Sequence, residues 1–131
     1  MILDGKKEAA LLREEIKKEI IALKEQDNKV PGLTVILIGD FVPSQIYVRN
    51  KEKNSKEVGI NSEVIKYSKD ISEKKILEKI EELNNDNNVS GILLSFSFKA
   101  AISFFISSLN NAASFLPSSI IFKVLFCKIF H

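Results

Sequence analysis

Before residue 95 the chain has three short segments rich in apolar residues, separated by longer stretches in which apolar positions recur with helical spacing. The run at 33–38 is apolar except for Thr34, partly β-branched, and followed by Gly39. This pattern is typical of a strand covered on both faces. The runs at 61–67 and 89–94 predict two further strands, and the alternation of Val64 and Lys66 indicates that the first of these is less buried, as at a sheet edge.

The longer stretches predict three helices. The first covers 4–25, with an apolar stripe made by Ala9, Leu12, Ile16, Ile20 and Leu23. The second covers 44–58, follows Pro43 and takes Ser44 as its N-cap. The third begins near Ser72, which is a good N-cap. Strands alternating with helices predict an α/β fold, a partial three-layer α/β/α domain with a mostly parallel sheet of about three strands and three helices.

The candidate chemistry lies on the second predicted helix. Tyr47 and Lys51 are four residues apart, so they project from the same side of that helix. They follow the carboxyl end of the 33–38 strand, where open α/β sheets bind their ligands. A phenol that stacks on a flat ring and an amine that transfers protons would be useful there. Taken alone, the pair is more typical of an ordinary solvated helix face.

The sequence around this pair resembles a known family. The run S-Q-I-Y-V-R-N-K, preceded by V-I-L-I-G and followed by K-E-V-G-I, resembles the amino-terminal domain of the bifunctional methylenetetrahydrofolate dehydrogenase/methenyltetrahydrofolate cyclohydrolase family. The similarity includes I-L-D-G-K at 2–6, L-R-E-E-I-K-K-E-I at 12–20 and I-E-E-L-N-N-D-N-N-V-S-G-I-L-L at 80–94. One departure occurs before the helix: the chain has Phe41-Val42-Pro43-Ser44 where the family usually has an acidic or amide residue and then Pro-Ala-Ser.

The resemblance implies a role for each site residue. Tyr47 would pack against the folate ring and Lys51 would carry the cyclohydrolase proton transfers, so both are candidate catalytic residues. Ser44 and Val48 would line the folate pocket with Tyr47. The resemblance also implies one-carbon metabolism, a folate substrate, NADP as cofactor of the intact family and a homodimer, although whether a shortened chain keeps that dimer is left open.

The resemblance stops at about residue 94. The family continues Gln-Leu-Pro-Leu-Pro, whereas this chain has Ser95-Phe96-Ser97-Phe98-Lys99, so the family glutamine falls on Ser95. The downstream aspartate that holds the pterin and the glycine-rich NADP-binding domain are both missing. Residues 1–94 are therefore predicted to be an incomplete folate-binding catalytic domain, and residues 95–131 an unrelated tail.

Composition changes at the same place. All 17 acidic residues lie at or before Asp86, and eight of the nine phenylalanines lie at or after Phe96. The reverse complement of AT-rich codons for residues 4–25, taken in a shifted frame, encodes residues 97–118 with one mismatch at Ala101. Asp4 pairs with Ser118 and Glu25 with Ser97. We infer that this Phe/Ser-rich, non-native tail is an inverted copy of the gene's own beginning, produced either in the genome or in sequence assembly.

Charge, apolar runs and cysteine content argue against several classes of function. The net charge of +2 comes from the tail and is not a nucleic-acid signal. The uncharged run at 100–122 is long enough for a membrane helix, but its polar residues and its antisense origin argue against one. Cys127 is alone, so neither a disulfide framework nor a metal site is expected. The charged amino terminus favours a cytoplasmic protein.

Three functional interpretations remain open from the sequence. The chain is a truncated and inactive copy of the enzyme, or a non-catalytic fragment that binds folate or pairs with a full-length subunit, or a chimeric reading frame without a function.

Overall fold

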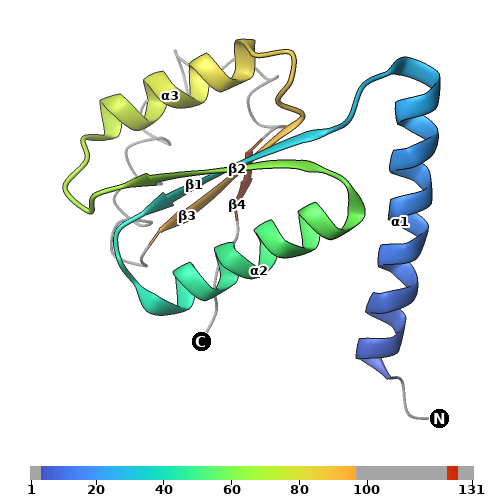
Figure 1. Ribbon diagram of the computed structural model, residues 1–131. Coiled ribbons are helices and arrows are strands. Elements are labelled where there is room, and N and C mark those ends of the chain that lie inside the picture. The colour runs from blue at the N-terminus through green and yellow to red at the C-terminus, as the bar shows by residue number, and fades with distance from the viewer. Residues whose placement is uncertain (1–3, 97–123, 127–131) are drawn as a thin grey trace.

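The structure is a computed structural model that describes residues 4–96 and 124–126. Its centre is a parallel sheet with the strand order β2-β1-β3-β4. In chain order the elements are α1 (Gly5–Asp27), β1 (Gly32–Ile38), α2 (Val42–Val58), β2 (Asn61–Tyr67), α3 (Glu73–Asn85), β3 (Gly91–Phe96) and β4 (Val124–Phe126). Figure 1 shows α2 and α3 on opposite faces of the sheet, while α1 stands to one side.

The two faces of the sheet bury separate apolar clusters, because successive strand residues point to opposite sides. On one face α3 packs on β1 and β3, burying Ile36, Ile38, Ile76, Ile80, Leu83, Val89, Ile92 and Leu94. On the other face α2 packs through Val48 on Val35, Leu37 and Leu93. Both internal strands are therefore apolar on both sides, which confirms the prediction for β1.

The α/β fold class is confirmed, with three helices and parallel strands. β2 has the predicted bounds and, since it pairs only with β1 among the described strands, it lies at the predicted edge. Ser72 caps α3 by accepting a hydrogen bond from the backbone N–H of Lys75. β3 begins at Gly91 rather than at Val89, because the Val89 N–H bonds to the carbonyl of Asp86 in a turn.

The prediction for the start of α2 was wrong. The helix begins at Val42, its N-cap is Phe41 and no side chain caps it, so Ser44 lies within the first turn instead of capping it. Pro43 accounts for the difference, since its fixed φ suits the first helical turn and it has no N–H that needs a partner.

The apolar stripe predicted for α1 is present but mostly uncovered. Only Ile20 is buried on this helix, whereas Leu12 and Leu23 are exposed. Within residues 4–96 and 124–126, no helix has the length and apolar content needed to cross a membrane. The tail at 97–123 and 127–131, including the apolar run at 100–122, lies outside the described residues.

Candidate functional site

The candidate site lies where β1 passes into α2. Gly39 follows β1 with a positive φ of 83°, a conformation that glycine adopts without strain. Its N–H donates to the carbonyl of Tyr67 at 2.9 Å, which ties the turn to the end of β2. The chain then enters α2, so the predicted site residues start just beyond the carboxyl ends of two adjacent strands. This is the edge of a parallel sheet where ligands bind.

Tyr47 and Lys51 are brought together as their spacing predicted. Both side chains are half-buried, and the Lys51 Nζ lies 5.8 Å from the centre of the Tyr47 ring. This distance is within the range of a cation–π contact. Among the described residues no carboxylate pairs with Lys51, since the four ion pairs found there involve other lysines and an arginine. The amine is therefore held next to an aromatic face and is not neutralised by a described acid.

Ser44 and Val48 lie on the buried side of α2. Val48 is part of the cluster between α2 and the sheet, so in this structure it contacts strand side chains. Ser44 is completely buried, and its Oγ has no hydrogen-bond partner among the described residues. A buried hydroxyl without a partner is unfavourable. The buried, unpartnered hydroxyl of Ser44 could not be predicted from the sequence, because it depends on the residues that surround the side chain in the fold. The roles of Ser44 and Val48 in substrate binding stay predictions.

Ser95 occupies the position where the resemblance places glutamine. It lies on β3 next to Leu37 of β1 and is buried. Because residues two apart on a strand share a face, Ser95 is on the same side of the sheet as Leu93, the side that α2 covers. The position is therefore on the correct face for a group that would meet α2, but the serine side chain is much shorter than glutamine and lacks the amide.

Gly32, Gly39 and Gly59 do not form a phosphate-binding loop. Gly32 begins β1, Gly39 follows it and Gly59 ends α2, so these glycines are not gathered into one phosphate-binding loop. In the same part of the chain, no group of three or more His, Cys, Asp or Glu side chains could hold a metal ion.

Comparison with known proteins gives a consistent result. The family model for the tetrahydrofolate dehydrogenase/cyclohydrolase catalytic domain matches residues 3–103, a few residues past the predicted end of the resemblance. The bifunctional protein FolD of Pelagibacter ubique is 58% identical over 94 residues, which are 72% of this chain and 34% of that protein.

Solved structures agree with the sequence matches. The bifunctional FolD methylenetetrahydrofolate dehydrogenase/cyclohydrolase of Campylobacter jejuni is 35% identical, with a TM-score of 0.71, over 82% of this chain and 40% of that one. The 5,10-methylenetetrahydrofolate dehydrogenase of the silkworm is 41% identical, with a TM-score of 0.69, over 71% of this chain and 32% of that one.

The chain thus spans about a third of the length of the curated relatives it matches. The family model covers well over half of this chain, and the likeness to the Campylobacter jejuni structure covers 82% of it. The chain belongs to the tetrahydrofolate dehydrogenase/cyclohydrolase family, and its residues 3–103 match the catalytic domain of that family.

Proposed function

We propose that this chain is a copy of the catalytic domain of the one-carbon folate enzyme, with a recognisable folate-binding helix but without effective turnover. In the intact family, one site oxidises 5,10-methylenetetrahydrofolate with NADP and hydrolyses 5,10-methenyltetrahydrofolate to 10-formyltetrahydrofolate. The observation that carries the proposal is the juxtaposition of the Lys51 amine and the Tyr47 ring, 5.8 Å apart, on a helix that starts at the sheet's carboxyl edge.

In this proposal Tyr47 binds and Lys51 transfers protons. The Tyr47 ring offers a flat apolar face on which the folate ring can stack. In the hydrolysis, a water oxygen bonds to the methenyl carbon, the bond from that carbon to N5 breaks, and one proton is released overall. An amine beside the bound ring can take a proton from the attacking water and return one to N5. Ser44 and Val48 would shape the same side of the pocket.

The serine at position 95 is one reason to expect that this chain has little catalytic activity. A glutamine there would supply an amide that hydrogen-bonds both the lysine and the folate, whereas Ser95 is short and buried. Residues that act as a unit lose activity together when one is removed. The dehydrogenase half of the reaction has even less support, since the described residues offer no nucleotide loop. We therefore expect no NADP-dependent oxidation and at most trace cyclohydrolase activity.

We propose that the chain is cytoplasmic and that folate is the molecule it binds. The homodimer is proposed only for the intact enzyme of the family.

A calorimetric titration of the purified chain with tetrahydrofolate tests the proposal. We expect measurable binding that Tyr47→Ala weakens about fivefold, since a stacking face contributes on the order of 1 kcal/mol. Lys51→Met should leave most of the binding intact. Lys53→Met is the matched control, because it changes an exposed lysine of the same helix. Binding that is absent, or unchanged by Tyr47→Ala, would reject the folate-binding fragment in favour of a chain without a function.

A further inference from the structure

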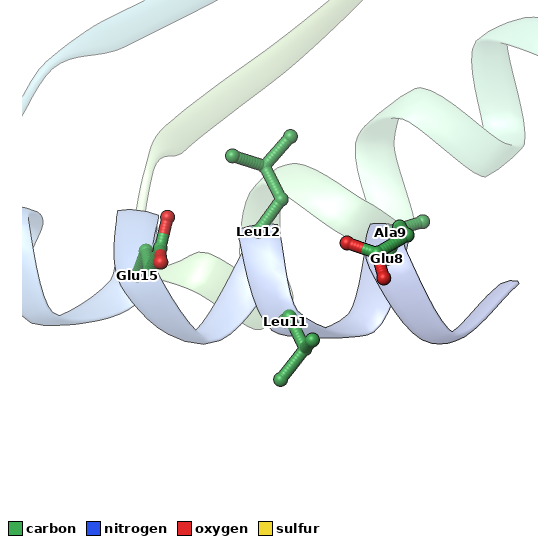
Figure 2. Close-up of a pocket in the computed structure, with 5 residues that line it drawn as sticks. All are labelled: Glu8, Ala9, Leu11, Leu12 and Glu15. Carbon is green, nitrogen blue, oxygen red and sulfur yellow. The ribbon is translucent and has the colours of Figure 1, made fainter. Parts of the chain in front are cut away.

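Exposed apolar side chains of the described residues lie in two places. One is α1, where Figure 2 shows Leu11 and Leu12 pointing away from each other in a shallow depression. All the residues that line this depression belong to α1, so it does not bring together groups from several elements, as ligand sites do. The other place is the start of α2, at the carboxyl edge of the sheet, and its exposed apolar residues are Phe41, Val42 and Ile46.

Phe41 is unusual in two respects. It is 44% exposed, whereas the other aromatic side chains in residues 4–96, which are Tyr47, Tyr67 and Phe96, are half-buried. Phe41 is also the N-cap residue of α2, and no side chain caps this helix. A serine, aspartate or asparagine there would accept a hydrogen bond from the first helical N–H groups, so phenylalanine makes the helix less stable. Departures from local preference of this kind are expected at functional sites.

The backbone that carries Phe41 is fixed by hydrogen bonds on both sides. The Gly39 N–H donates to the carbonyl of Tyr67 at 2.9 Å. Gln45 binds the same turn twice, since its backbone N–H donates to the Phe41 carbonyl at 3.1 Å and its side-chain Nε2 donates to the Asp40 carbonyl at 3.0 Å. The ring is therefore exposed on a turn that is already ordered, and a ligand that covers it need not order the backbone first.

Phe41 and Tyr47 are spaced for two neighbouring rings of one ligand. They lie six residues apart at the start of α2, which corresponds to a rise of about 9 Å along the helix. A folate has two aromatic ring systems, a pterin and an aminobenzoyl group, joined by a short link. With one ring system at Tyr47 and Lys51, the other can reach the first turn of the same helix, where Phe41 lies.

We propose that Phe41 is a second stacking residue of the folate site and binds the aminobenzoyl ring, while Tyr47 and Lys51 act at the pterin and its one-carbon group. This inference rests on the proposed folate function and adds a residue that determines how the substrate is held. The acidic or amide residue that the family usually has before the helix can cap it but has no aromatic face. The contact would therefore be particular to chains with an aromatic residue at this position.

A calorimetric titration of the full 131-residue chain with tetrahydrofolate tests the inference. Phe41→Asn replaces the ring by a neutral residue that caps helices well. It should weaken tetrahydrofolate binding about fivefold and at the same time raise the Tm by about 4 °C, because α2 gains a cap. Ile46→Asn is the matched control, since Ile46 is 46% exposed on the same helix but lies nearly opposite its buried side at Ser44. This control should bind tetrahydrofolate as the parent chain does.

The possible results separate this inference from the proposed function. If Tyr47→Ala weakens binding and Phe41→Asn does not, the inference is overturned and the proposed function is unaffected. If the parent chain does not bind tetrahydrofolate, both are overturned. If Phe41→Asn lowers the Tm together with the affinity, the ring supports the fold instead of the ligand, and the inference is again overturned.

A second ligand tests which ring Phe41 binds. p-Aminobenzoylglutamate contains the aminobenzoyl ring but no pterin, and its binding can be followed by chemical-shift changes in NMR spectra. Phe41→Asn should weaken this binding by the same factor of about five, and Ile46→Asn should leave it unchanged. Equal binding to the parent chain and to Phe41→Asn, or no binding to either, overturns the assignment of Phe41 to the aminobenzoyl ring.

Discussion

Replacing Ser44 by alanine should make the protein more stable, which is unusual for a change in the core. The Ser44 Oγ is fully buried, and the described residues give it no hydrogen-bond partner. Leaving a buried hydroxyl without a partner costs about 1–3 kcal/mol. Alanine also has the higher helix propensity, by roughly 0.5 kcal/mol. The change removes a few packing contacts of one oxygen atom, so we expect the free energy of unfolding to rise by about 1–2 kcal/mol.

Urea unfolding followed by circular dichroism measures this effect, and a thermal melt should show an increase in Tm of about 4–8 °C per kcal/mol for a domain of this size. Ser55→Ala is the matched control. Ser55 is also buried in α2, at 7% exposure, but its hydroxyl is not among the buried polar atoms that lack a partner. It should therefore show only the propensity gain. If Ser44→Ala lowers stability relative to Ser55→Ala, the hydroxyl has a partner and the reasoning fails.

Other changes test the fold, the site and the tail. Gly32→Ala should destabilise the protein by roughly 1–3 kcal/mol in the same urea assay, because its Cβ would overlap the backbone carbonyl of Asn88, whereas Gly5→Ala, which meets no atom within 4 Å, should not. In a hybrid enzyme with glutamine at position 95, continued with the rest of a FolD relative, Lys51→Met should lower the cyclohydrolase rate by about 10²–10⁴-fold while folate still binds, and Tyr47→Ala should mainly weaken folate binding. Equal rates with lysine and methionine would show that the amine is not the proton-transfer group. At the nucleotide level, an inverted repeat should join the start of the gene to the tail codons, and sequencing without it would reject the antisense origin.

The sequence predicted those parts of the fold that depend on local signals. The apolar run of β1 and the Ser72 cap of α3 were both predicted correctly. Each is set by residues close together in the sequence. The start of α2 was not, because the preference of Pro43 for the first helical turn outweighs the capping preference of Ser44. The exposure of Leu12 and Leu23 on α1 could not be predicted either. Helical periodicity shows that an apolar stripe exists, but only the three-dimensional arrangement shows what covers it.

For the candidate site, too, the sequence predicted local features and missed those that depend on tertiary packing. The spacing of Tyr47 and Lys51 fixed their proximity in advance, since residues four apart on a helix are neighbours. The complete burial of Ser44 depends on the packing of α2 against the sheet, which involves residues far away in the chain. The role of each residue in catalysis comes from the family resemblance and stays a prediction that the variants above can test.

Beyond Phe96, β4 is the part of the tail that the structure describes. Val124–Phe126 pairs in parallel with β3, so a segment predicted to be unrelated to the catalytic domain adds a short strand to its sheet. Strand pairing uses backbone N–H and C=O groups, which every residue except proline provides. An open strand edge therefore accepts almost any extended segment of the same chain. Pairing of this kind needs no selected sequence, so β4 does not conflict with an antisense origin of the tail. What an unselected sequence lacks is consistency between its local pattern and the fold, in side-chain packing and in the satisfaction of polar groups.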